Sequence, residues 1–257
     1  PEEIKSNPHG HDIDRQPWFE CACCPTNIVR FLPSIPGYIY SKSNKDVWIH
    51  LYIQSKVNLE LNNSKIELSQ KTSQPWNGKC KISIKNKHKK SFSLYLRQPY
   101  WSKGLVIKQK KKIIKTTVQK GYIKIAVPAD LQTTIDIDLG MGINLVSSHP
   151  KVRQNNGKLA VQRGPIIYCM EETDNGKHLH NISLIGKVLK PSPTNIKSYK
   201  YVSIKGKGLF NSLNNWNNKL YSSNAIKKIE RKNIKMIPYF LWANRRVGEM
   251  RVWFNSI

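Results

Sequence analysis

Three of the chain's five cysteines lie within four consecutive positions, as Cys21, Cys23 and Cys24. A disulfide between the adjacent Cys23 and Cys24, or a small ring joining Cys21 to Cys23, would be strained, so a local disulfide framework is disfavoured. Thiolates are soft ligands that suit zinc. The cluster therefore leaves three interpretations open: a metal site, a reactive thiol with supporting groups, or a cysteine-rich turn without chemistry.

The residues that follow the cluster predict a short helix. Pro25 suits the first turn, where a missing N–H group costs nothing. An apolar face recurs at spacings of three and four, formed by Ile28, Val29, Phe31 and Leu32. We expect Cys23 and Cys24 to lie just before the helix, where the positive end of the helix dipole lowers a thiol pKa below about 8.5. If Cys24 binds Zn²⁺, Cys23 beside it becomes either a second ligand or a nucleophile.

A complete zinc site needs about four ligands, and no second cluster of suitable spacing is present in the sequence. Glu20 is adjacent, but in extended backbone its side chain points away from Cys21, which favours a surface carboxylate. Pairs of histidines that could share a strand face more often serve packing or solvation: His9 with His11, and His178 with His180. The other two cysteines lie in strand-like runs and are expected to be inert core residues: Cys80 and Cys169. The outstanding ligands must come from elsewhere.

The chain is strongly basic, with 43 Lys and Arg against 16 Asp and Glu, a formal charge of +27. Such a charge raises nucleic acid or another polyanion as a partner. However, lysine greatly outnumbers arginine and is spread over every segment, with no helix-turn-helix, zinc-finger or RNA-binding aromatic motif beside it. We therefore expect a solvated basic surface and no nucleic-acid partner.

The length of 257 residues suits two domains, and 39% apolar residues can fill cores of ordinary size. No stretch approaches the roughly 20 apolar residues of a membrane span, so no membrane partner is expected. The first residues, PEEIK, contain neither an initiator Met nor a signal peptide. We interpret the chain as the interior of a longer protein, so that part of its site lies before residue 1.

From residue 46 the apolar period becomes two, which predicts half-buried antiparallel strands. Turn residues separate the strands at 62–63, 77–78 and 120–121, a spacing typical of a β-sandwich or jelly roll. The alternation breaks at residues 140–142 and then resumes. We predict one β domain over residues 41–144 and a second, smaller one over 145–257, with a long loop at 208–224.

Residues 15–30, RQPWFECACCPTNIVR, resemble the Cys-x-Cys-Cys-Pro-x-Asn segment of glycoside hydrolase family 127, the β-L-arabinofuranosidases. Two later blocks agree: residues 160–171, AVQRGPIIYCME, with Asp174 and Asn175, and residues 238–245, PYFLWANR, followed by GEM at 248–250. The resemblance spans essentially the whole chain. Its first block is highly specific, whereas the other two mark β domains rather than chemistry.

The resemblance implies a mainly β chain that begins with the end of an (α/α)6 catalytic barrel, residues 1–40, followed by two antiparallel, jelly-roll-like β-sandwich domains, residues 41–144 and 145–257. It implies that Cys23 is the nucleophile and that Cys23 and Cys24 both bind Zn²⁺. The remaining ligands, a Glu and a Cys, and the glutamate acid/base would lie upstream of residue 1. Cys21 would have a supporting role at most.

By the same resemblance the parent would be a retaining hydrolase acting on an L-arabinofuranosyl-containing glycan or oligosaccharide, and this chain alone would be inactive. A homodimer is compatible with the sequence, and we expect a bacterial periplasmic or cytoplasmic location. One alternative is a carbohydrate-binding module that stacks sugars on exposed aromatic side chains: Trp76, Tyr100, Trp101 or Trp216. The other is a zinc-stabilised polyanion-binding protein.

Overall fold

The computed structural model describes residues 15, 18, 21–61, 63–86, 90–129, 132–196, 198–213, 216, 219–223 and 229–256. The chain divides into two compact units, one of Glu20–Gly142 and one of Ile143–Ile257 together with Pro1–Phe19. Among the described residues no helix is long and apolar enough to cross a membrane. Each unit has its own architecture.

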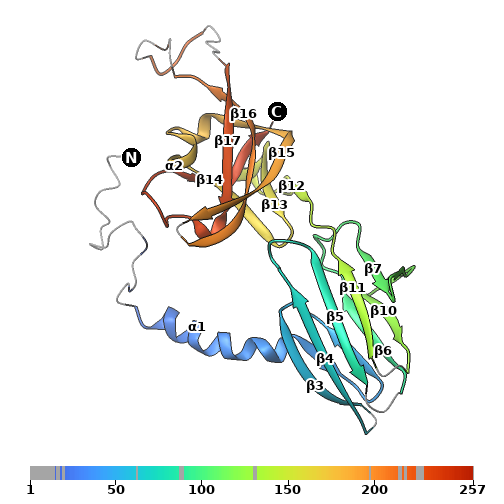
Figure 1. Ribbon diagram of the computed structural model, residues 1–257. Helices are drawn as coiled ribbons and strands as arrows, with labels where there is room; N and C mark the ends of the chain where they lie inside the picture. Colours follow the sequence, from blue (N-terminus) through green and yellow to red (C-terminus); the bar gives the residue numbers. More distant parts are fainter. Residues whose placement is uncertain are drawn as a thin grey trace. The chain divides into compact units, whose positions relative to one another are not determined.

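The unit of Glu20–Gly142 begins with helix α1, Cys23–Ser34, and the 3-10 turn η2, Ile35–Tyr38. Two sheets follow (Figure 1). The first contains, in spatial order, β1 (Tyr40–Lys42), β2 (Asp46–Ile49), β6 (Phe92–Arg97), β10 (Tyr122–Val127) and β9 (Val118–Gln119). The second contains β3 (Ser55–Leu61), β4 (Ser64–Thr72), β5 (Lys79–Asn86), β11 (Gln132–Asp138), β7 (Val106–Gln109) and β8 (Lys112–Ile113).

The core of this unit follows from the period-two pattern, because alternate side chains of a strand point to the same face. Along β5, for example, Cys80, Ile82 and Ile84 are buried, whereas Lys81 and Lys85 are exposed. Both sheets contribute to one buried cluster of apolar side chains. All strand pairs are antiparallel except β2 with β6, which is parallel. The half-buried antiparallel strands that the sequence predicts are therefore present in this unit.

The described residues of the unit Ile143–Ile257 form eight strands: β12 (Ile143–Ser147), β13 (Lys158–Arg163), β14 (Ile166–Glu171), β15 (Ile182–Ile196), β16 (Tyr199–Asn211), β17 (Ile229–Pro238), β18 (Met250–Arg251) and β19 (Trp253–Ser256). Four single-turn elements interrupt them: η3 (Arg153–Asn155), α2 (Glu172–Asn175), η4 (Leu179–Asn181) and η5 (Tyr239–Leu241). Their pairing forms a closed ring in the order β13, β19, β15, β16, β17, β14 and back to β13. This unit is therefore a six-stranded barrel.

The prediction of a second β-sandwich for residues 145–257 is wrong, since this unit has one closed sheet and not two facing sheets. Closure occurs because β13 divides its pairing: residues 158–160 pair with β19 and residues 161–163 pair with β14. The loop expected at 208–224 also begins later than predicted. Strand β16 continues to Asn211 and pairs with β17 up to that residue.

Candidate metal and thiol site

Helix α1 starts at Cys23, so that Cys23 and Cys24 lie in its first turn rather than just before it, as the sequence had suggested. Pro25 is in the same turn, as predicted. Thr26 contributes a local bond, because its hydroxyl lies 2.9 Å from the Ala22 carbonyl oxygen and can donate to it. The two adjacent thiols are thereby fixed at the end of the helix where backbone N–H groups are unsatisfied.

The three sulfur atoms of the cluster lie within 4.8 Å of one another. The Sγ atoms of Cys23 and Cys24 are 3.7 Å apart, and those of Cys21 and Cys23 are 3.1 Å apart. Two thiolates bound to one tetrahedral zinc, each at about 2.3 Å, have sulfurs about 3.8 Å apart. The Cys23–Cys24 pair fits two corners of such a site, whereas Cys21 and Cys23 are too close together and are better described as a thiol–thiol contact.

Hydrogen bonds between the thiols shift the pKa values of Cys21 and Cys23 in opposite directions. A hydrogen bond with Cys23 lowers the pKa of Cys21, and the hydrogen bonds with Cys21 and Cys24 raise the pKa of Cys23 to about 11. Within the thiol cluster, these hydrogen bonds act against the lowering of the Cys23 pKa that is expected from the helix end. A bound dication would reverse this order, because its charge favours the thiolate.

Among the described residues, none of the other sequence candidates joins this cluster. Cys80 and Cys169 are buried, and burial raises the pKa of each thiol to about 12, as expected for inert core residues. His178 and His180 contact each other edge to face, with ring centroids 5.9 Å apart, in the other unit. His9, His11 and Glu20 lie outside the described residues.

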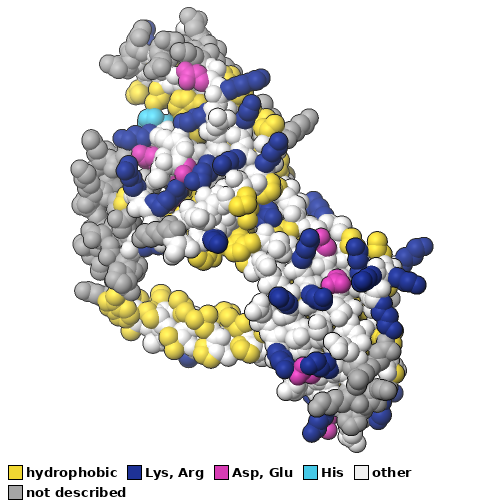
Figure 2. Space-filling view, viewed as in Figure 1, with side chains coloured by type: hydrophobic (Ala, Val, Ile, Leu, Met, Phe, Trp, Pro, Cys, Tyr) yellow, Lys and Arg dark blue, Asp and Glu magenta, His cyan; other side chains and the backbone are white. Residues whose placement is uncertain are grey.

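Cys23 and Cys24 open onto a shallow hollow of about 510 Å³, which Thr26, Asn27 and Arg30 also line. All three cysteines of the cluster are exposed. The predicted apolar face of α1 is exposed as well: Ile28, Val29, Phe31 and Leu32 keep 55 to 68% of their accessible surface (Figure 2). A helix with this much exposed apolar surface, and with no buried residue, has the composition of an element made to pack against others.

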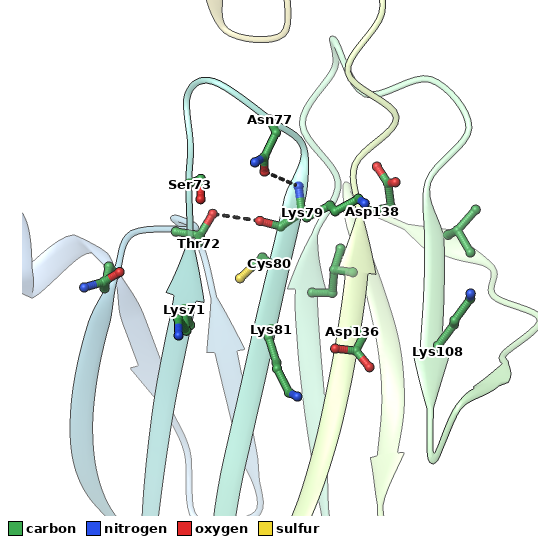
Figure 3. Close-up of a pocket in the computed structure, with 13 residues that line it drawn as sticks. Lys71, Thr72, Ser73, Asn77, Lys79, Cys80, Lys81, Lys108, Asp136 and Asp138 are labelled. Atoms are coloured by element: carbon green, nitrogen blue, oxygen red, sulfur yellow. Dashed lines mark hydrogen bonds between the residues drawn. The ribbon is translucent and has the colours of Figure 1, made fainter. Parts of the chain in front are cut away.

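A second hollow, of about 540 Å³, lies on the outer face of the second sheet of the sandwich (Figure 3). Side chains from four neighbouring strands form a row across it: Lys71, Lys81, Asp136 and Lys108. No aromatic side chain is among its lining residues. It is an open surface on which lysines outnumber carboxylates.

The four aromatic candidates for sugar stacking differ in exposure. Trp101 is buried in the sandwich core, which corrects its assignment as an exposed side chain. Trp76 and Trp216 are half-buried. Tyr100 is exposed at 85%, and it remains a candidate for binding a sugar ring.

Comparison with protein families identifies the two β units that follow the cysteine cluster. A model of the GH127 middle domain of β-L-arabinofuranosidase matches residues 46–141, and a model of the glycoside hydrolase family 127 C-terminal domain matches residues 143–255. The chain carries the middle and C-terminal domains of glycoside hydrolase family 127. The resemblance inferred from the three sequence blocks is thereby confirmed.

Relatives within family 127 agree along the full chain. A non-reducing end β-L-arabinofuranosidase of Bifidobacterium longum subsp. longum is 28% identical over 262 residues, covering 96% of this chain and 39% of the relative. The crystal structure of a GH127 β-L-arabinofuranosidase from Geobacillus stearothermophilus T6 matches with a TM-score of 0.92 and 31% identity, covering 100% of this chain and 41% of that one. The chain thus spans about two fifths of the length of these family 127 proteins.

Proposed function

We propose that this chain is the middle and C-terminal part of a retaining β-L-arabinofuranosidase in which Cys23 is the nucleophile. The observation that carries the proposal is the exposed Cys23–Cys24 pair, with sulfurs 3.7 Å apart in the first turn of α1, in a chain of family 127. Two relatives are described as β-L-arabinofuranosidases, which makes an L-arabinofuranosyl-containing glycan or oligosaccharide the proposed substrate.

Cys23 and Cys24 would hold a zinc ion together with ligands from the part of the parent that precedes this chain. The spacing of the two sulfurs fits two positions of a tetrahedral site, and exposed thiols are accessible to further ligands. When bound, zinc would supply a positive charge that lowers the pKa of the Cys23 thiol at neutral pH.

The proposed reaction consists of two displacements. The Cys23 sulfur attacks the anomeric carbon, a C–S bond forms, and the C–O bond to the leaving group breaks while a carboxylic acid of the parent protonates the departing oxygen. Water then attacks the same carbon, its proton passes to that carboxylate, and the C–S bond breaks to release L-arabinose. Each displacement inverts the anomeric centre, so the product retains the configuration of the substrate.

The exposed apolar face of α1 supports the proposed place of this helix at the end of an (α/α)6 catalytic barrel. Ile28, Val29, Phe31 and Leu32 would pack against the barrel helices of the parent and close the site around Cys23. The purified 257-residue chain is therefore expected to show no hydrolysis of an aryl β-L-arabinofuranoside, because the proposed acid/base and the other zinc ligands are upstream.

The decisive experiment uses the longer protein that contains this chain. Cys23→Ser should abolish hydrolysis of the aryl substrate, and Cys24→Ser should reduce both bound zinc and hydrolysis, whereas Cys80→Ser, which alters a buried thiol of the same unit, should leave hydrolysis within about twofold. Wild-type turnover after Cys23→Ser would reject Cys23 as the nucleophile. Turnover by the isolated chain that disappears on Cys23→Ser would reject the proposed incompleteness.

A further inference from the structure

In the unit that contains the C-terminal barrel, the two later sequence blocks meet around Arg245, and Arg15, the first residue of the cysteine-containing block, contacts the closing block. We propose that Arg15 anchors the chain leading into the cysteine cluster on the turn Tyr239–Leu241 and Trp242, and that an ion network around Arg245 holds this turn in shape. The anchor is inferred from contacts within one unit. Its importance for the reaction rests on the proposed function of Cys23.

The guanidinium group of Arg15 donates two hydrogen bonds to the turn. Its Nε donates to the Trp242 carbonyl oxygen at 2.6 Å, and its Nη2 donates to the Phe240 carbonyl oxygen at 3.1 Å. A planar guanidinium can satisfy two such acceptors from one side, and the positive charge strengthens both bonds. The carbonyl between them, that of Leu241, accepts instead from Asn244 at 2.9 Å. The turn therefore offers Arg15 two carbonyls in a fixed arrangement.

The end of this turn has an unfavourable backbone conformation. Ala243 follows it with φ of 59°, a left-handed conformation that an L residue with a Cβ atom rarely adopts. Its N–H donates to Oε1 of Glu171 at 3.0 Å, which holds it there. The rings of Tyr239 and Trp242 stack across the turn, with centroids 6.3 Å apart and planes 14° apart.

Arg245 fixes the carboxylates behind the turn. It donates from Nη1 to Asp174 at 2.9 Å, and its Nη2 bonds Glu171 and the second oxygen of Asp174. Lys235 on β17 also donates to Asp174, at 2.9 Å. The side chains of Glu171 and Asp174 are only 4% and 10% exposed, so these ion pairs are largely shielded from water. Glu171 thus binds the turn with one oxygen and the arginine with the other.

These contacts join the two later sequence blocks, residues 160–175 and residues 238–245, to each other. Glu171 ends β14 and Asp174 lies in α2, both beside β17 (Figure 1), while Ala243 and Arg245 belong to the closing block. Arg15 is the first residue of the block that contains the cysteines and stands eight positions before Cys23. Arg15 thus ties the start of the cysteine-containing block to the closing block.

The anchor can be tested in the 257-residue chain, without zinc or turnover, by chymotrypsin cleavage after Trp18. A protease needs several extended residues on either side of the cleaved bond, and Arg15 lies within that span, so cleavage requires release of the anchor. Arg15→Ala should accelerate cleavage by about three- to tenfold while the midpoint of thermal unfolding stays unchanged, because the Arg15 side chain is exposed. Arg15→Lys, which keeps the charge and one donor group, should restore part of the protection.

The matched control is Arg246→Ala, since Arg246 is exposed and adjacent to Arg245 in sequence but takes no part in the network. Arg245→Ala should accelerate cleavage as Arg15→Ala does; should Arg245→Ala fail to fold, the two Arg15 variants still decide the matter. Equal cleavage rates for wild type, Arg15→Ala and Arg246→Ala would overturn the anchor and leave the hydrolase proposal intact. Conversely, a parent protein that hydrolyses no arabinofuranoside would not affect the cleavage result.

Discussion

Cys23 lies between the thiols of Cys21 and Cys24, and its hydrogen bonds with them make it harder to deprotonate. The hydrogen bond with Cys21 is the main cause of its raised pKa of about 11. Cys21→Ala removes this bond, so the pKa of Cys23 should fall towards the ordinary value of about 8.5 and the thiolate fraction at pH 8 should rise about tenfold or more. We expect faster alkylation of Cys23 by iodoacetamide in the metal-free chain, measured by peptide mapping.

The control for this prediction is Cys80→Ala, which removes a thiol from the sandwich core and leaves the cluster unchanged. A Cys23 alkylation rate that is the same in Cys21→Ala and wild type would show that Cys21 does not hold the proton. A faster rate in Cys80→Ala would point to a general loosening of the unit instead.

At the scale of residues, the sequence predicts what depends on neighbours along the chain. Cys23 and Cys24 are adjacent, and Pro25 marks the helix start, so their proximity and their place on α1 could be inferred. The contact of Arg15 with Trp242 joins residues 227 positions apart, and nothing local signals it. The thiol pKa order was also beyond prediction, since it depends on sulfur distances of a few tenths of an ångström.

At the scale of elements, the alternating pattern predicts strands but not how a sheet closes. Ile82, Ile84 and Leu68 were recognisable as core residues because burial repeats with the strand period. Whether strand β13 pairs with one neighbour or divides between β14 and β19 depends on partners about 5 and about 95 positions away. The strands of a barrel and of a sandwich show the same alternation of apolar and polar residues. The sequence therefore predicted a sandwich for the C-terminal unit, whereas the structure has a barrel.

The ion network that joins β14, α2 and β17 makes the stability of the barrel depend on pH. Burial by itself would raise the pKa of Asp174, but the hydrogen bonds from Arg245 and Lys235 outweigh it and lower that pKa. A carboxylate with a lowered pKa contributes stability above its unfolded pKa of about 3.9 and loses it as the pH falls through the folded value. Asp174→Asn should therefore reduce the free energy of unfolding by about 1–3 kcal/mol at pH 7, and by less below pH 4.

Urea unfolding at pH 7 and at pH 3 measures this difference, with Asp136→Asn as the control because Asp136 is an exposed carboxylate on β11. The same loss of stability from Asp174→Asn at both pH values would mean that the side chain acts by its shape and not by its charge. If Asp136→Asn lowered the free energy of unfolding at pH 7 as much as Asp174→Asn does, the ion network would not be the cause of the loss.

At the scale of the whole molecule, each unit has a separate set of fully buried side chains, among them Leu68 in the sandwich and Phe254 in the barrel. Replacing either by alanine leaves a cavity that costs about 2–5 kcal/mol in its own core. We therefore expect two calorimetric transitions, with Leu68→Ala lowering the midpoint of one and Phe254→Ala lowering the other, each by about 10 °C or more. If both variants lower one shared transition, the two units unfold as a single cooperative body, and the division of the chain at residues 142 and 143 has no thermodynamic meaning.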